Sequence, residues 1–424
     1  MNLKAIGLFC LAVLSCLYLP AQQKGMVAEV AFEGLKRTQE SHLRRFLRTN
    51  VGQPLEVELI QADQQRLQNL YSIAQAKHRL DSIGPKQWKV VFLIEEAWTL
   101  FPQVSISGVE DNVWFEIGAT ELNLSGRGIL LSAAYRNIDG RSNYQVYFQQ
   151  PYIGGSQWGV SAGLHRYAST EPLYFPVGAV QYDYTNLSAE AGVSYEFSLG
   201  HRLSIGTTYF IERYERLPHP EQLPSSVPVF ANLPKLLVKA SHQLDRLNYH
   251  GIYLSGWVNY SLLESVYNMQ YEDFFQLFIN DFHYFRRIKY RGNLAARIRV
   301  GLSSNTDSPF APFVLDSRIN IRGSGNRVDR GTGTVIMNLE YRHSFLERRN
   351  LAIQGVVFSD IGVWRTPGGG WDDFVNPEYL RHFVGSGIRI IYPRAHNAML
   401  RIDYGFGLFQ GGESGLVVGF GQYF

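Results

Sequence analysis

Alternation of apolar and polar residues dominates the chain from about residue 101 to its end. Runs of about ten residues, such as GILLSAAYR, YQVYFQQPY and TVIMNLEYRH, place apolar side chains at every second position. This period of two predicts strands with one apolar and one polar face. Turn-rich segments separate the runs. We place about fifteen strands and infer a sixteenth, because a barrel whose two ends lie on the same side needs an even count.

Two architectures accommodate such strands, a secreted β-sandwich and a closed barrel that spans a membrane. The many strands within residues 101–424, with aromatic residues at their ends, favour the barrel, in which one face contacts lipid and the other a polar lumen. Aromatic residues make up 14% of the chain, with 25 Tyr, 26 Phe and also 40 Gly. The sequence therefore predicts an all-β transmembrane barrel of about 16 antiparallel strands.

Residues 26–97 have a different pattern. VAEVAFEG alternates like a strand, Thr38 is placed to cap a helix through QESHLRRFLRT, and VELIQADQQRLQNLYS has the spacing of a second helix. The segments IAQAKHRLD and WKVVFLIEE indicate two further strands. This order of strand, helix, helix, strand and strand resembles a POTRA domain, the periplasmic module of outer-membrane assembly proteins.

Residues 1–21 have the features of a secretory signal peptide, with Lys4 ahead of an apolar run and a small residue at the cleavage position. Both cysteines, Cys10 and Cys16, lie inside this segment, so the mature chain would have no disulfide. Cys16 follows VLS, which leaves a lipoprotein acceptor site as an alternative. No later stretch approaches the about 20 consecutive apolar residues of a transmembrane helix.

Composition and motifs give little support to other classes of function. The net charge of +3 and the lack of a long basic run argue against nucleic acid as a partner. GVSAG at 159–163 fits the Gly-x-Ser-x-Gly elbow of hydrolases, but that elbow needs a strand-to-helix turn and Ser161 lies in an alternating run. The 11 His are scattered without metal-ligand spacing. We therefore expect no catalysis, no metal and no cofactor.

The segment 304–332 is a long loop between two barrel strands. If Phe424 ends the last strand on the periplasmic side, counting back through the strands places this loop at the extracellular end. Charged residues on the two following strands belong to the lumen, where a carboxylate is costly unless it is solvated or paired. The inward sets are Asn338, Glu340 and Arg342 on one strand, and Phe358, Asp360 and Gly362 on the next.

Two motifs in this region resemble those of one family. IRG at 321–323 resembles the Val-Arg-Gly-aromatic loop motif of the BamA-type outer-membrane assembly superfamily, and FSDIG at 358–362 matches its Phe-x-Asp-x-Gly strand motif. NLSGRG, PYIGG and NLEYR also resemble its barrel. Here Ser324 replaces the family's aromatic residue, and a single POTRA-like unit resembles the short members. The resemblance implies that Arg322 holds the loop inside the barrel against Asp360, with Glu340 as a second candidate; the expected set is Arg322, Gly323, Glu340, Phe358, Asp360 and Gly362.

The family resemblance also implies a function. We expect a protein of the outer membrane, with its POTRA domain in the periplasm, that assists insertion or translocation of client proteins. Its partners would be outer-membrane lipids and unfolded clients or other envelope subunits. A passive pore or transporter, or a structural accessory subunit, remains as an alternative.

The end of the chain resembles the terminal signal of outer-membrane barrels, with Phe424 last and Gly419 five residues earlier. Gln422 departs from that pattern, since the position is usually apolar or aromatic. We expect the seam of the barrel between strands near 113–122 and 414–424, where glycines weaken strand packing. Those glycines are Gly415, Gly419 and Gly421.

Overall fold

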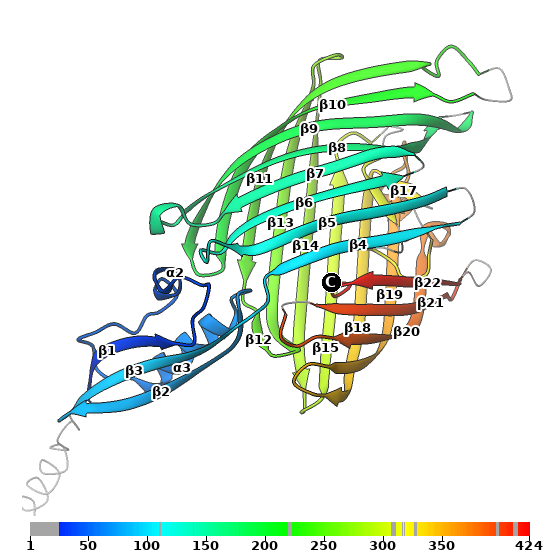
Figure 1. Cartoon of the computed structure of the whole chain (residues 1–424). Helices are drawn as coiled ribbons and strands as arrows, with labels where there is room; N and C mark the ends of the chain where they lie inside the picture. Colours follow the sequence, from blue (N-terminus) through cyan, green and yellow to red (C-terminus); the bar gives the residue numbers. More distant parts are fainter. Residues whose placement is uncertain are drawn as a thin grey trace, which may run out of the picture.

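The structure is a computed structural model of the chain. It describes residues 25–424 except 110–111, 139, 176, 219–222, 307–310, 316, 318, 326–328, 396–397 and 410–413. The expected signal peptide, including Cys10 and Cys16, lies outside the described residues. Figure 1 shows a small N-terminal domain beside one end of a large barrel.

The N-terminal domain is a three-stranded sheet with two helices. Its elements are β1 (Met26–Glu33), α2 (Glu40–Arg44), α3 (Val57–Gln68), β2 (Ile73–Gly84) and β3 (Gln87–Glu96). The strand order is β1-β3-β2, with β1 parallel and β2 antiparallel to β3. Buried apolar side chains from the sheet and both helices form one core, including Val30, Leu43, Ile60, Leu67 and Phe92. The expected element order is confirmed.

The start of α2 differs from the prediction. Gln39, not Thr38, occupies the N-cap position, and no side chain caps the helix. The Thr38 hydroxyl instead accepts a hydrogen bond from Asn123 Nδ2 of the barrel at 3.0 Å. The capping motif in the sequence therefore marks a contact between domains. None of the helices in the described part of the chain has the length and apolar character needed to cross a membrane.

The barrel follows at Leu100. Its strands are β4 (Leu100–Val109), β5 (Asn112–Leu124), β6 (Ile129–Ile138), β7 (Arg141–Gln150), β8 (Trp158–Phe175), β9 (Gly178–Ser198), β10 (His201–Arg216), β11 (Phe230–Asp245), β12 (Asn248–His250), β13 (Tyr253–Asn268), β14 (Asp273–Ile288), β15 (Gly292–Ser303), β18 (Gly333–Glu347), β19 (Ala352–Arg365), β20 (Arg381–Ile391), β21 (Met399–Gly407) and β22 (Ser414–Phe420). Short 3₁₀ turns are η1 (Ile153–Gly155), η2 (Trp371–Val375) and η3 (Pro377–Tyr379).

These strands form one closed sheet in which β22 lies next to β4. The three-residue strand β12 pairs only with the first residues of β13, so sixteen longer strands form the wall in the described chain. The barrel begins one strand earlier than expected, because 113–122 belongs to β5 and β4 is the first strand. The sequence of β4 contains Pro102. Proline is uncommon within strands except at sheet edges, so the pattern did not predict a strand here.

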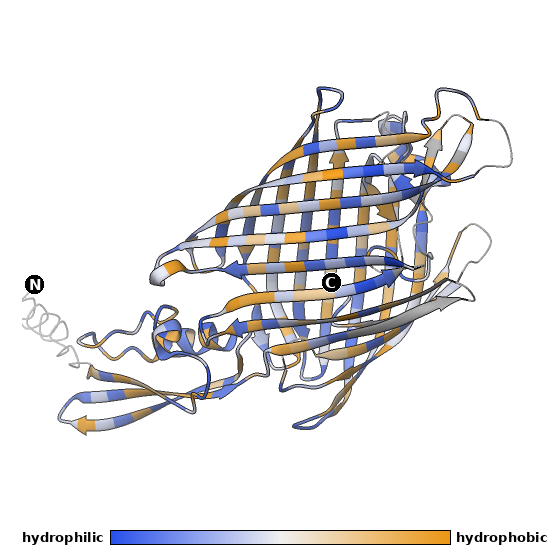
Figure 2. Cartoon of the chain, turned by 45° about the horizontal axis from the view of Figure 1, so that its top comes forward, coloured by the Kyte–Doolittle hydropathy of each residue, from blue (hydrophilic) through white to orange (hydrophobic). Residues whose placement is uncertain are grey.

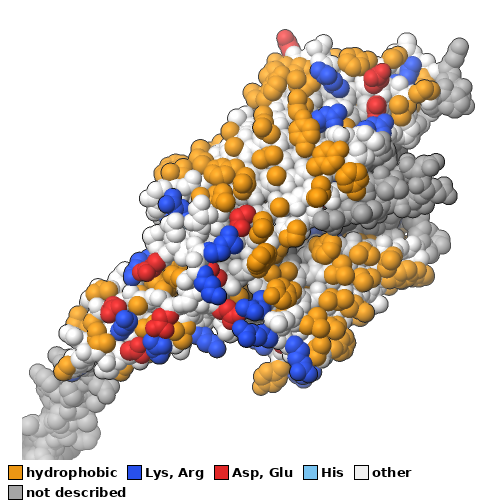
Figure 3. All heavy atoms as spheres, in the orientation of Figure 1, with side chains coloured by type: hydrophobic (Ala, Val, Ile, Leu, Met, Phe, Trp, Pro, Cys, Tyr) orange, Lys and Arg blue, Asp and Glu red, His pale blue; other side chains and the backbone are white. Residues whose placement is uncertain are grey.

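The strands carry apolar residues outward and polar residues inward. In β19, Gln354, Phe358 and Asp360 are buried, whereas Val357 is 57% exposed on the outer face. Figure 2 shows hydrophilic and hydrophobic residues alternating along the barrel strands. In Figure 3, hydrophobic side chains cover much of the barrel's outer face, and charged side chains gather over the N-terminal domain and its junction with the barrel. This distribution is that of a transmembrane barrel.

The N-terminal domain contacts the barrel rim at several points. The Arg45 guanidinium lies 3.6 Å from the centroid of the Tyr152 ring. Asn69, directly after α3, donates from Nδ2 to the Leu247 carbonyl at 3.0 Å, and its Oδ1 accepts from the Tyr249 amide at 3.0 Å. The side-chain amide thereby pairs with the backbone beside β12 as a neighbouring strand would. These contacts hold the domain against the mouth of the barrel.

Candidate functional site: a loop held in the barrel interior

The segment 304–332, called the inserted loop below, joins β15 to β18 at the end of the barrel opposite the N-terminal domain. It contains a small hairpin of β16 (Phe313–Leu315) and β17 (Asp329–Gly331). Ile321 is fully buried and packs in a cluster with Leu315, Trp364 and Phe383. The described part of the loop that the sequence places at this end is therefore packed against the inner wall.

Arg322 makes the central contacts of the inserted loop. Its Nε donates to Asp360 Oδ2 at 2.8 Å and its Nη2 to Asp360 Oδ1 at 2.9 Å, a bidentate pair. The Arg322 backbone amide also donates to Asp360 Oδ2, at 3.0 Å. Nη1 forms an ion pair with Glu340. Both carboxylates expected from the sequence thus contact the same guanidinium, and we call Arg322, Glu340 and Asp360 the loop lock.

Two aromatic rings complete the surroundings of Arg322. Its guanidinium lies 3.6 Å from the centroid of the Phe358 ring and 4.4 Å from that of Tyr423. A planar guanidinium can stack on an aromatic ring while its edge donates to carboxylates, and lysine cannot do both. Phe358 of the FSDIG motif therefore has a specific place in the site, on the same strand as Asp360.

Other wall residues grip the backbone beside Arg322. Arg297 Nη2 donates to the Ile319 carbonyl at 2.6 Å, and Asn338 Nδ2 donates to the Asn320 carbonyl at 2.8 Å. Asn338 also donates to Asp360 Oδ1 at 2.7 Å, which orients that carboxylate. The inserted loop is thus held at consecutive residues by hydrogen bonds as well as by the loop lock.

Ion pairs join the buried charged residues inside this part of the barrel. Arg322, Arg342 and Arg389 are fully buried, and so are Glu340, Asp360 and Asp403. Arg389 Nη1 donates to Asp403 at 2.6 Å, and Arg342 pairs with Glu340. Burial of an ion is costly unless its charge is paired and its polar atoms are hydrogen bonded. These six residues form one connected network, and removal of a single member leaves its partner uncompensated. Two further buried cations, Arg297 and Arg401, lie beside the network.

Glycines allow the inserted loop to approach the wall. Gly323 has φ of +94°, and a Cβ there would lie 2.8 Å from the Gly405 backbone of β21. A Cβ at Gly362 would overlap Ile321, and one at Gly415 would lie 2.9 Å from the Gly323 carbonyl. A Cβ on Gly419 would come 2.7 Å from Arg401 Nε. Gly415 and Gly419, expected only to weaken the seam, also make room for these inward contacts.

The end of the chain departs from the prediction. β22 ends at Phe420, and Gly421 with φ of +79° turns the last residues away from the sheet. Tyr423 is buried and donates to the Ser317 carbonyl of the inserted loop at 3.1 Å. The Phe424 ring lies 5.9 Å from the His283 ring of β14. Phe424 therefore does not end the last strand; the tail enters the barrel and supports the inserted loop.

The structure thus brings Arg322, Glu340, Phe358 and Asp360 into one site, with Gly323 and Gly362 at its border. Three further residues of the site were not predicted from the sequence: Arg389 on β20, Asp403 on β21 and Tyr423 after β22. The alternation along β21 places Asp403 on an inward face with Arg401, whereas Arg389 shares the inward face of β20 with Phe383, Gly385, Gly387 and Ile391. Nothing local marked Tyr423, because its position depends on the turn at Gly421.

Comparisons with known proteins agree with this architecture. A POTRA family model, described as a surface antigen variable number repeat, matches residues 26–96. BamA from Haemophilus ducreyi lacking POTRA domains 1–3 is 13% identical with a TM-score of 0.56, over 93% of this chain and 84% of that chain. CdiB from Acinetobacter baumannii has the same identity, TM-score and coverage of this chain, and 74% of that chain is covered.

CdiB from Escherichia coli is 12% identical with a TM-score of 0.58, over 93% of this chain and 75% of that chain. No curated protein sequence matches the chain at a significant level. At these identities the likeness concerns the fold: a transmembrane barrel preceded by a POTRA domain. The expected resemblance to the BamA-type superfamily is confirmed at that level, with one POTRA domain in the described chain.

Proposed function

We propose that this protein resides in the outer membrane, with its POTRA domain in the periplasm, and assists insertion or translocation of client proteins. The observation that carries the proposal is the loop lock inside a barrel whose mouth carries a docked POTRA domain. Its partners are outer-membrane lipids and unfolded client proteins or other envelope subunits. The BamA and CdiB fold supports the same class of role.

Client capture at the POTRA sheet would use an open strand edge. The order β1-β3-β2 leaves β1 and β2 at the two edges. The first part of β1 is already bonded, since the Val27 amide donates to Gln53 and the Gly52 amide donates to Val27. We therefore assign client strand addition to β2, where main-chain groups of an unfolded segment can pair with the sheet.

The seam between β22 and β4 is the proposed place where the wall opens. Each is the terminal strand of the barrel, so their parting breaks no covalent connection. An inserted loop bound to the inner wall is unfavourable for a passive pore, because such a pore needs a continuous open lumen. In this proposal the loop lock keeps the inserted loop inside the barrel while β22 and β4 separate.

Depletion of the protein tests this function. The outer-membrane proteome is quantified after depletion, with complementation by the wild type or by a variant lacking residues 26–97. We expect a defined set of outer-membrane or surface proteins to decrease, and the truncated variant to restore little of it. An unchanged proteome combined with altered uptake of small solutes would favour a pore instead.

A further inference from the structure

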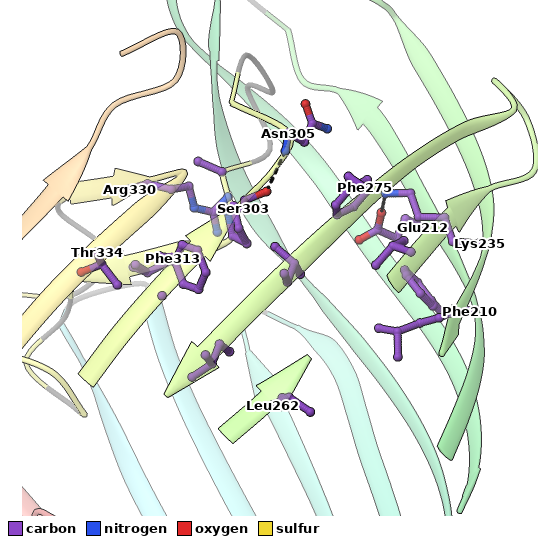
Figure 4. A pocket seen from close by; sticks show the side chains of 18 of the residues that line it. Phe210, Glu212, Lys235, Leu262, Phe275, Ser303, Asn305, Phe313, Arg330 and Thr334 are labelled. Carbon is purple, nitrogen blue, oxygen red and sulfur yellow. Dashed lines mark hydrogen bonds and ion pairs between the residues drawn. The ribbon is translucent and has the colours of Figure 1, made fainter. Parts of the chain in front are cut away.

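A cavity of about 1010 Å³ lies in the barrel interior between the wall and the inserted loop. It is separate from the loop lock and lies against β10, β11, β13, β14 and β15. Figure 4 shows labelled side chains from these strands and from the inserted loop around it. Binding cavities for small ligands are typically about 300–1000 Å³, so this volume suffices for a large one.

Apolar side chains make up a large part of the cavity wall, beside charged and polar ones. In a water-filled barrel the inward side chains are mostly polar. Here several inward side chains on adjacent strands are apolar. The neighbouring outward residues are apolar as well: Val238, Leu263 and Phe278 are 48%, 44% and 39% exposed on the outer face. At these positions the strands therefore have apolar residues on both faces, although the inward face of β13 also carries Glu264 between Leu262 and Val266. The inward apolar set includes Leu237, Leu262, Val266, Phe275, Leu277 and Ile279.

Charged residues of the cavity pair with one another. Lys235 Nζ donates to Glu212 at 2.6 Å, Arg299 Nε to Asp281 Oδ2 at 3.0 Å, and Arg330 Nη2 to Glu171 at 3.3 Å. Asp273 adds an exposed carboxylate at one end. The cavity thus has no excess of positive charge to select an anionic group.

The inserted loop contributes the cover. Ala311, Pro312 and Phe313 line the cavity, and the Phe313 ring lies where a Cβ on Gly301 would be, 2.7 Å from its Cδ1. Backbone groups of the wall strands are already paired in continuous ladders. A bound polypeptide would need partners for its own amides, whereas a hydrocarbon chain needs none.

The cavity is also long enough to hold a hydrocarbon chain. From Asp273 near the outer end to Asp281 near the inner end, β14 advances eight residues, or about 26 Å at about 3.3 Å per residue. The hydrocarbon core of a bilayer is about 30 Å thick, so one extended acyl chain reaches about 15 Å. The exposed side chains of Tyr271 and Asp273 lie at the end that a polar head would occupy.

We propose that this cavity binds the acyl chain of a neutral, single-chain amphiphile such as a monoacylglycerol. The apolar inner faces of β13 and β14 hold the chain, and the polar head stays at the outer end. This site does not depend on which clients the barrel handles, and it gives the barrel a ligand distinct from the bulk lipid on its outer face.

Because inward and outward residues alternate along each strand, the positions that are labelled show on which side of the wall a lipid binds. The full-length protein is placed in nanodiscs with a long-chain monoacylglycerol that carries a photoreactive diazirine on its acyl chain. Cross-linked residues are mapped by mass spectrometry, with and without excess unlabelled monoacylglycerol. We expect saturable labelling of the inward Leu262 and Leu277, and non-saturable labelling of the outward Leu263 and Phe278.

Two adjacent substitutions form the matched pair. Leu262→Trp fills the cavity and should reduce inward labelling at least fivefold, whereas Leu263→Trp, one residue away on the outer face, should leave it unchanged. If Leu262→Trp does not give a heat-modifiable barrel, Leu277→Asn replaces it and should have the same effect. Labelling confined to outward residues, inward labelling that does not saturate, or displacement only by an apolar peptide would overturn the proposal.

Discussion

Arg322 has no access to solvent, although it belongs to a loop rich in glycine and polar residues. A cation in that position is stable only because Asp360 and Glu340 accept its hydrogen bonds and Phe358 stacks on its face. The contribution of the loop lock to the stability of the inserted loop is therefore best measured by removing one partner at a time. Lysine would retain the charge but lose the bidentate geometry.

A double-mutant cycle tests the loop lock. Arg322→Ala and Asp360→Ala should each destabilise the inserted loop by several kcal/mol, up to the about 3–5 kcal/mol of a broken buried pair. Because both remove the same interaction, the double variant should be little worse than either single one. Limited proteolysis within 304–332 and single-channel conductance are the measurements. Additive effects would mean that the two residues do not act together.

Gly323 tests the close approach of the inserted loop to β21. Gly323→Ala adds a Cβ at a left-handed φ and within 2.8 Å of the Gly405 backbone, so it should loosen the loop as Arg322→Ala does. Gly368 also has a positive φ, of +77°, but nothing lies within 4 Å of its Cβ position. Gly368→Ala is therefore the control for strain alone. Equal proteolysis of both variants would argue against close packing.

The junction between the POTRA domain and the barrel is the clearest feature at the scale of elements. α2 and α3 contact the rim through His42, Arg45 and Asn69. The Asn69 side chain forms hydrogen bonds with the backbone at Leu247 and Tyr249, as a neighbouring strand would. The short strand β12 is additional to the sixteen strands of the wall. Such polar contacts are weaker than a buried apolar interface.

Docking of the POTRA domain should depend on pH through His42. Burial against the barrel and the nearby Arg45 charge lower the pKa of His42 from 6.5 to about 4. The docked state thus disfavours the protonated ring, so docking is complete above pH 6.5 and weakens as the pH falls toward about 4. Hydrogen exchange of amides in residues 123–128 should quicken at pH 5 relative to the intrinsic rate.

His42→Phe provides the control for this pH dependence. Phenylalanine keeps the aromatic contact with Phe46 and Tyr152 but cannot be protonated. Its exchange rates, corrected for intrinsic chemistry, should be nearly independent of pH. If the wild type and this variant respond alike, another group controls the junction.

Removal of the POTRA domain tests whether barrel insertion and client-dependent activity are separable. The barrel has its own closed sheet and the loop lock, and neither uses residues 26–97. A variant without these residues should still insert as a barrel but lose client-dependent activity. Membrane fractionation and the proteome measurement described above are the assays. Full activity of this variant would show that clients do not need the domain.

At the scale of the whole molecule, the barrel has an apolar exterior and a partly filled interior. Its closed sheet satisfies the backbone hydrogen bonds that a membrane leaves without water partners. The inserted loop after β15 and the C-terminal tail after β22 both pack inside the barrel. The last four residues are thus part of the interior and not of the wall.

The purified protein should behave as a closed barrel. In detergent it should give a β-rich circular dichroism spectrum and migrate faster on gels when unheated than when boiled, because the folded sheet resists denaturation. Removal of the tail after Phe420 should preserve this heat modifiability but increase proteolysis of the inserted loop, since Tyr423 would be lost. A monodisperse, water-soluble monomer without detergent would contradict the barrel.

The sequence by itself determined the class of fold and much of the site. Alternation set the strands, because each barrel strand has one lipid face and one inner face, and the helical spacing of residues 57–68 marked α3. Arg322 and Asp360 were identifiable because two short motifs carry them, and Glu340 because it is an inward charge that needs a partner. These features are local, so each can be recognised within a single short stretch of sequence.

Only the tertiary structure decided features that join distant segments. The first strand β4, whose sequence contains Pro102, was not recognised; its pairing with β5 and its place beside β22 make it part of the wall. Thr38 has the pattern of a cap but bonds the barrel, and Phe424 has the pattern of a strand end but lies inside. Arg389, Asp403 and Tyr423 joined the site only once the sheet had closed. Closure brings residues far apart in sequence into one low-dielectric interior, where charges must find partners.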